Sequence, residues 1–209
     1  MHVVSERRTD VVVRGAQHTV DTASNEVTVD GGDSGRVAIR CPEGSHVVVG
    51  AASGRVVLEG VFGDVRVTTS SGRVEIGSAA SVDVRSASGG VAVDECTGEC
   101  RCVSKSGRIE VGRAGALVAD SASGRVVAEH VGGAVVHTGT GRVRVGVDAS
   151  APVVVRSVSG AVEIDLPRGR APQARLVSTS GRIQSECSSG ADGEIDVETV
   201  SGRIDVRCR

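Results

Sequence analysis

Large aromatic side chains are almost absent from this chain. It contains no Trp and no Tyr, and Phe62 is the only aromatic residue among 209. A core without large rings has to be filled by Val, Ile, Leu and Ala, which suit the gap of about 10 Å between two packed sheets. This absence argues against a deep, wide interior and favours a narrow, extended molecule.

An excess of charge is missing as well. The formal net charge is −2 at pH 7, so bulk electrostatics give no reason to expect nucleic acid or an anionic membrane as a partner. Lys105 is the only lysine, so nearly all of the positive charge is arginine.

Long apolar runs are not found either. Residues 1–8 lack the apolar stretch of about 7–15 residues that a signal peptide needs, and no run approaches the roughly 18 residues that span a bilayer. We therefore expect a cytoplasmic protein without direct membrane insertion. Its six cysteines are then expected to be reduced, because cytosolic disulfides are uncommon.

Glycine is abundant, with 29 residues, and much of it belongs to one repeat. A Ser-Gly-Arg tripeptide or a close variant returns every 17–21 residues. Around each repeat glycine, apolar residues alternate with polar ones on both sides, as in Val65/Val67 before Gly72 and Val74/Ile76 after it. Alternation with period two is typical of half-buried strands, so each repeat predicts two short strands. The ten copies begin at Ser34, Ser53, Ser71, Ser88, Ser106, Ser123, Thr140, Ser159, Ser180 and Ser201.

Two strands per repeat fit either stacked coils or the hairpins of a meander. A meander would leave one long apolar face that only barrel closure or a second sheet could bury. In a solenoid, each inward pair stacks on the same pair of the next coil, which explains why equivalent positions are alike. The sequence therefore predicts an all-β fold, a single parallel β-solenoid of about ten two-stranded coils with a thin aliphatic core and no aromatic core. We expect one domain over residues 1–209, with 1–26 as an irregular N-terminal coil or cap and the repeats over 27–209.

The residue after the repeat glycine is arginine in eight coils, and its register places it on the outer surface. Acidic residues two positions further on, such as Glu75 and Glu110, favour a solvated face of mixed charge. The alternative is a surface for a polyanionic partner, such as an acidic glycan or an acidic protein. We call these residues the arginine row: Arg36, Arg55, Arg73, Arg108, Arg125, Arg142, Arg182 and Arg203.

Outward positions on the other set of strands are unusually apolar. Either the N-terminal segment covers these valines, or they form a homodimer or partner face, although small exposed stripes are also common in monomers. A second route to self-association is the C-terminal coil, which ends at Arg209 without a visible cap. We call the apolar residues the valine face: Val103, Val118, Val135, Val154 and Val177.

The cysteines do not indicate a metal site. Cys100 and Cys102 occupy inward positions where other coils carry valine, so we expect them to be small buried hydrophobes. Histidines are not clustered nearby, whereas a structural zinc site normally has two ligand pairs with compatible spacing. Cys187 and Cys208 share one register in adjacent coils, which would bring their Cα atoms within disulfide range, although we expect reduced thiols. No metal or cofactor is predicted.

A catalytic constellation is not visible. The repeat glycine and its Ser or Thr have a turn explanation, since a corner between strands commonly needs positive φ. Ten equivalent serines cannot all be nucleophiles. A polysaccharide lyase or hydrolase would need carboxylates or bases clustered in one groove, and the five histidines are scattered.

The repeated Ser-Gly-Arg-Val pattern and the closing stretches Val158 to Ile164 and Ser178 to Ile183 resemble the bacterial toast-rack family of β-strand-repeat proteins, also described as adhesin-like. The resemblance covers nearly the whole chain. It implies a β-repeat module of unknown function, often attached to envelope-associated proteins and linked to stress sensing or protein interaction. We therefore predict a non-enzymatic interaction or scaffold module with a protein partner or a second copy of itself. The alternatives are a polysaccharide-acting enzyme with a groove along the solenoid and an exported adhesin.

Overall fold

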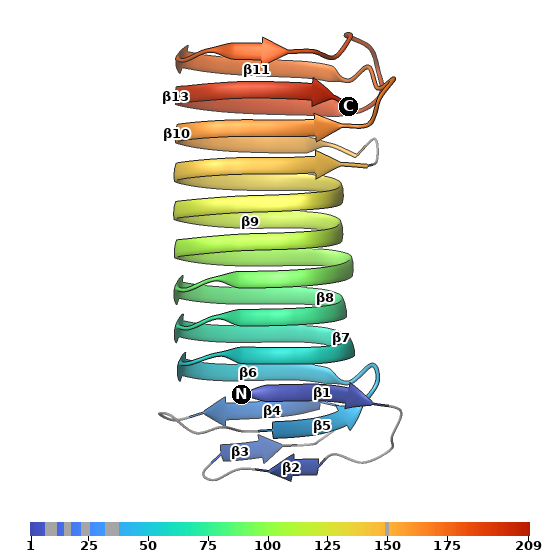
Figure 1. The fold of residues 1–209 in the computed structure, drawn as a ribbon, viewed down its shortest axis with the longest axis vertical. Helices are drawn as coiled ribbons and strands as arrows, with labels where there is room; N and C mark the ends of the chain where they lie inside the picture. The colour runs from blue at the N-terminus through green and yellow to red at the C-terminus, as the bar shows by residue number, and fades with distance from the viewer. Residues whose placement is uncertain (7–11, 15–17, 22–25, 32–37, 149–150) are drawn as a thin grey trace.

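A computed structural model describes residues 1–6, 12–14, 18–21, 26–31, 38–148 and 151–209 of this chain. The described residues form a parallel β-solenoid of about eight turns and contain no helix (Figure 1). The predicted count of ten coils is not confirmed, and its first repeat, Ser34-Gly35-Arg36, lies outside the described residues. The strands are β1 His2–Glu6, β2 Val12–Arg14, β3 His18–Asp21, β4 Glu26–Gly31, β5 Ala38–Pro42, β6 His46–Ser53, β7 Val56–Ser71, β8 Val74–Ser88, β9 Val91–Val147, β10 Val153–Leu166, β11 Gln173–Ser180, β12 Ile183–Ser185 and β13 Glu194–Cys208.

Successive coils stack as parallel strands with equivalent residues in register. Val56 pairs with Val74, and Val74 pairs with Val91. The same stacking continues into β9, whose repeat glycines 107, 124 and 141 each approach the backbone of the repeat glycine one coil earlier, beginning with Gly89 just before the strand. This register confirms the predicted winding and excludes a meander of hairpins.

The core lies between the two strand faces of each coil and consists mainly of the alternating apolar residues. Ile109 and Val111 from one face and Cys100 and Cys102 from the other are at most 1% exposed. A third inward position occurs in five coils, at the corner that follows the first strand, and the sequence analysis missed it. Its buried residues are Phe62, Ala79, Cys96, Ala114 and Val131. Because Phe62 is 2% exposed, the prediction of a core without any aromatic residue is wrong at this position.

The repeat glycine is required by the close approach of neighbouring corners. Gly107 has φ of 149°, and a Cβ atom placed on it would lie 2.1 Å from the carbonyl oxygen of Gly89. Glycine tolerates positive φ at little cost, and only the absence of a side chain permits this contact. The column of glycines therefore sets the spacing between coils at this corner.

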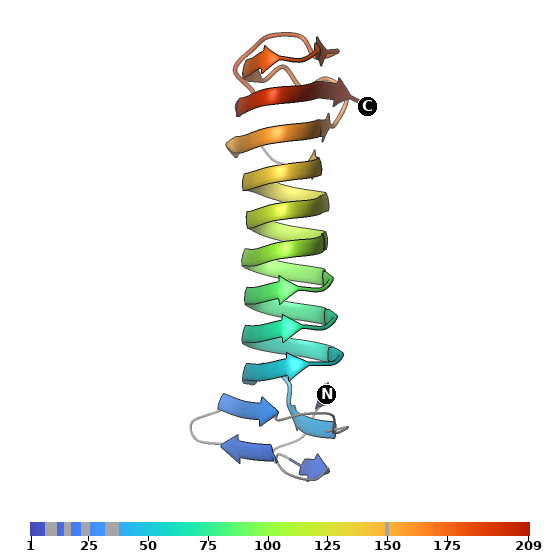
Figure 2. The ribbon, with the colours of Figure 1, turned by 90° about the vertical axis from the view of Figure 1, so that its left-hand side faces the viewer.

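The N-terminal strand is inserted between two later strands. β1 pairs in parallel with β5 on one side and with β7 on the other. The strands β2 and β3 then pair antiparallel with β5 and β4 at the end of the solenoid (Figures 1 and 2). These antiparallel strands cover the N-terminal end of the parallel stack.

The C-terminal strand is inserted in the same way. β13 pairs in parallel with β10 on one side and with β11 and β12 on the other, so the order along the axis is β10, β13, β11 (Figure 1). The prediction that the C-terminal coil forms an uncapped end is therefore wrong. The terminal coil of the stack is the preceding one in sequence, made of β11 and β12, and it covers β13.

Side-chain composition explains why β13 lies between β10 and β11, an arrangement that we call the threaded order. β13 contributes four apolar inward residues, Ile195, Val197, Ile204 and Val206, which are all at most 2% exposed. The equivalent inward positions of β11 and β12 include Ser185, and Ile183 is 41% exposed there. Burying the more apolar coil between two neighbours removes more apolar surface from water, and this stabilises the threaded order.

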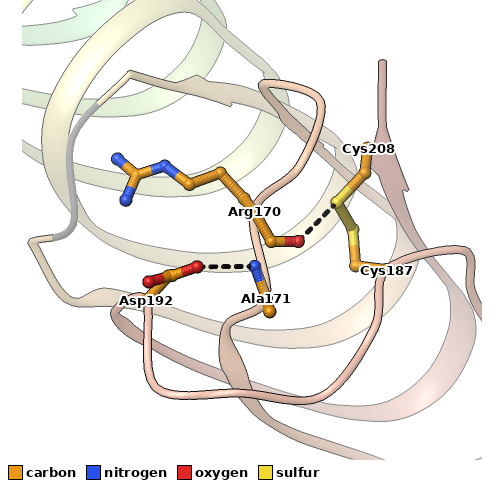
Figure 3. The surroundings of a disulfide bond; sticks show 5 residues. All are labelled: Arg170, Ala171, Cys187, Asp192 and Cys208. Atoms are coloured by element: carbon orange, nitrogen blue, oxygen red, sulfur yellow. Dashed lines mark hydrogen bonds between the residues drawn. A yellow bond between two sulfur atoms is a disulfide. The ribbon is translucent and has the colours of Figure 1, made fainter.

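A disulfide closes the threaded end. Cys187, which follows β12, is bonded to Cys208 at the end of β13, with their Cα atoms 5.4 Å apart (Figure 3). The prediction that the Cα atoms of this pair lie within disulfide range is thus confirmed. The expectation that both thiols are reduced is wrong for this pair. The Sγ atom of Cys208 also lies 3.4 Å from the carbonyl oxygen of Arg170. The bond joins the covering coil directly to the strand that it covers.

Candidate functional site

The arginine row lies on the outer surface of the first strand face and is partly neutralised. Arg55 and Arg73 both pair with Glu75, and Arg73 Nε lies 2.9 Å from Glu75 Oε1. Arg108 pairs with Glu110 at 3.2 Å. Arg203 similarly pairs with Asp205, whereas for Arg125, Arg142 and Arg182 no ion pair is found with another described residue, and Arg36 lies outside the described ranges.

The valine face lies on the outer surface of the second strand face and occupies two adjacent columns. Val135 pairs with Val154 in the next coil, and Val118 holds the equivalent position one coil earlier. Val103 and Val177 belong to the neighbouring column, two residues closer to the repeat glycine. The described N-terminal strands pair at the β5 and β7 end of the stack (Figure 1) and do not lie over these valines.

A shallow groove of about 720 Å³ runs beside the valine face, across β9, β10, β13 and β11. Val103 and Val177 line it, together with two exposed valines that the sequence analysis missed, Val158 at 56% and Val200 at 54% exposure. Small residues form part of the groove floor: Ala122 and Gly139 occupy, in the two preceding coils, the position that Val158 holds in its own coil. These residues stand two positions before the repeat glycine, where the other described coils have Ser, Ala, Lys or Thr. Comparing that single register would have revealed the two valines.

An ion-pair network borders the groove and crosses three coils. Arg156 of β10 and Arg175 of β11 both contact Asp196 and Glu198 of β13, and Arg175 Nη1 lies 3.1 Å from Asp196 Oδ1. The hydrogen bonds and charges of Arg156, followed by those of Arg175, lower the pKa of Asp196 from its ordinary value. The network therefore links the inserted strand to both of its neighbours.

Histidine–carboxylate pairs occur on the surface but do not form a hydrolytic triad. His46 Nδ1 lies 3.1 Å from Asp64 Oδ2, and the hydroxyl of Ser81 donates to the other oxygen of Asp64. The carboxylate is thus the central group, whereas activation of a serine needs the histidine between serine and acid. The pairs His130–Asp148 and His137–Asp120 contain no nucleophile. That the chain is not an enzyme stays a prediction.

The remaining cysteines are part of the core. Cys100 and Cys102 are fully buried, as predicted, and their Sγ atoms are 3.8 Å apart. Hydrogen bonding to Cys102, together with burial, raises the pKa of Cys100, so its thiol stays protonated. No group of three or more His, Cys, Asp or Glu residues able to hold a metal ion occurs in the described ranges. The same ranges hold no helix long and apolar enough to cross a membrane.

The fold and this surface define a class of protein, a parallel β-solenoid repeat module with long outer faces. Within that class, the chain belongs to the Toastrack DUF4097 family, whose model matches residues 3–209. The resemblance in the repeat pattern is thereby confirmed. No curated protein and no solved structure matches the chain.

Proposed function

We propose that this chain is a non-enzymatic interaction module that binds a protein through the outer surface of its second strand face. The observation that carries the proposal is the apolar groove beside the valine face. This groove crosses β9, β10, β13 and β11, and two of its valines are more than half exposed. Contiguous exposed apolar surface rimmed by charged residues is typical of protein-binding sites.

The shape of the surface supports a macromolecule more than a small substrate. Small-molecule sites are usually concave and bury most of their ligand, whereas this groove is more open than enclosed. The arginine row is a weaker candidate for binding, because Glu75, Glu110 and Asp205 already compensate more than half of its described members. A polyanion would have to compete with these carboxylates.

The test is affinity capture from the native host with three forms of the protein. Val158→Asp places a charge in the groove, and Val61→Asp is the matched control, because Val61 is 53% exposed but lies outside the groove. Proteins retained by the wild type and by the control, and lost with Val158→Asp, support the proposal. Capture of the same proteins by all three forms, or of none by the wild type, contradicts it.

A further inference from the structure

The apolar core is left open at the end of the stack that the covering coil forms. Within the described residues, β11 and β12 pair only with β13, so the other edge of each strand has no paired neighbour (Figure 1). Ile183 of β12 holds an inward position in register with Ile204, and it is 41% exposed. Its equivalents in eight other coils are all at most 1% exposed: Val56, Val74, Val91, Ile109, Val126, Val143, Val162 and Ile204.

The inward residues of β11 are uncovered in the same way. Leu176 is only partly buried, although Val197, with which it pairs, is fully buried. Ala174 is exposed, whereas its partner Ile195 is 2% exposed. One more coil on this end would remove these apolar side chains from water. The unpaired edge of β11 is eight residues long and contains no proline, so its backbone can accept a further strand.

We propose that this edge binds an extended segment of a partner protein, which adds one turn to the solenoid. Within the chain itself, strands close the opposite end of the stack, where β2 and β3 pair with β5 and β4. In strand addition of this kind, backbone hydrogen bonds give affinity and the side chains of alternate residues give specificity. The site goes beyond the proposed function, because it uses a strand edge and not the groove.

The glycine column limits which segment fits. Gly181 lies against the carbonyl of Gly202, as Gly202 lies against that of Gly160, without room for a side chain. A segment that stacks on Gly181 in this way needs a glycine at the corner and apolar residues over Leu176 and Ile183. The expected segment therefore has the alternating pattern of the repeat itself.

Contacts between coils indicate which charge the segment carries. In three places, an outward arginine bonds to the side chain that stands two positions further on in the next coil of the stack. Arg182 is the outward arginine of the covering coil, and no ion pair joins it to another described residue. A carboxylate of the partner at the corresponding position would complete the pattern and fix the register. The three bonds are Arg55–Glu75, Arg144–Asp165 and Arg203–Gln184.

A synthetic peptide of residues 194–208 with Cys208→Ser is the probe, because β13 has the expected apolar pattern, the glycine and an acid at Asp205. The labelled peptide is expected to bind the wild-type protein in a fluorescence anisotropy titration and to slow hydrogen exchange in β11. Ile183→Asp should weaken binding at least about tenfold, because it places a charge against the apolar segment. Val61→Asp is the control, since Val61 is 53% exposed in β7, several coils away. Absence of saturable binding, or equal binding by Ile183→Asp and the wild type, would overturn the proposal.

A charge exchange tests the register. Arg182→Glu is expected to weaken binding of this peptide and to strengthen binding of a peptide that also carries Asp205→Arg. Arg125→Glu is the matched control, because Arg125 belongs to the same row in an interior coil. The same response to both peptides from Arg182→Glu and Arg125→Glu would contradict the register.

Sedimentation equilibrium identifies the occupant of the edge. Wild-type dimers that Ile183→Asp dissociates would show that a second copy occupies it, and they would overturn the assignment to a partner segment. An unchanged mass for the wild type and Ile183→Asp, together with peptide binding by the wild type alone, supports the assignment.

Discussion

At the scale of the residue, the repeat glycine is the position at which the fold tolerates least change. Adjacent corners approach so closely that a methyl group on Gly107 would overlap the backbone of Gly89. Gly90, which directly follows Gly89, is different. A Cβ atom on Gly90 would have its nearest neighbouring atom 3.9 Å away, and its backbone has no positive φ that would strain a side chain.

Gly107→Ala is therefore expected to destabilise the protein by about 2–4 kcal/mol, through positive-φ strain and displacement of a coil. The matched variant Gly90→Ala is expected to stay within about 1 kcal/mol of the wild type. Urea denaturation followed by circular dichroism measures both. Equal stability of the two variants would contradict the account of the glycine column.

At the scale of the element, the disulfide holds the covering coil on the inserted strand. The bond closes a loop with a sequence separation of 21 residues. Replacing both cysteines, as in Cys187→Ser with Cys208→Ser, is expected to cost about 3 kcal/mol. Hydrogen exchange should then rise in β11 and β12 while β8 stays protected.

Reduction of the wild type is the control for this prediction, because it should reproduce the loss of stability. The stability of the double variant should not change on addition of reductant. A wild type indifferent to reductant would contradict a stabilising role for the bond. Disulfides are uncommon in the cytosol, so this bond weighs against the cytoplasmic location expected from the sequence, which stays a prediction that cell fractionation can test.

The ion-pair network at the same end predicts a dependence on pH. Because Arg156 and Arg175 lower the pKa of Asp196 below its ordinary value of 3.8, this carboxylate stabilises the fold above that value and loses its contribution as the pH falls through its folded-state pKa. Asp196→Asn should lower stability at neutral pH and reduce the loss on acidification below about pH 4. Denaturation curves between neutral and acidic pH measure this. Asp94→Asn, which changes an exposed carboxylate, is the control, and the same pH profile for both variants would contradict the prediction.

At the scale of the whole molecule, much of the solenoid could be predicted from the sequence and the order of its coils could not. Periodic apolar pairs such as Val74/Ile76 repeat along the chain, so winding, register and the inward place of Cys100 follow from local pattern. Stacking order at the ends depends on competition between coils for burial, and a repeat pattern is equally compatible with β11 or β13 beside β10. The groove was missed in part for the same reason, since Val158 and Val200 become neighbours only in the threaded order.

The order of the last three coils can be measured most directly with pairs of nitroxide labels, in samples diluted with unlabelled protein. Labels on Cys introduced at 158 and 200 would lie one coil apart, about 5 Å at the backbone, and labels at 158 and 179 two coils apart, about 10 Å. We predict stronger dipolar coupling for the 158/200 pair. Stronger coupling for the 158/179 pair would show that β11 lies beside β10 and would contradict the threaded solenoid.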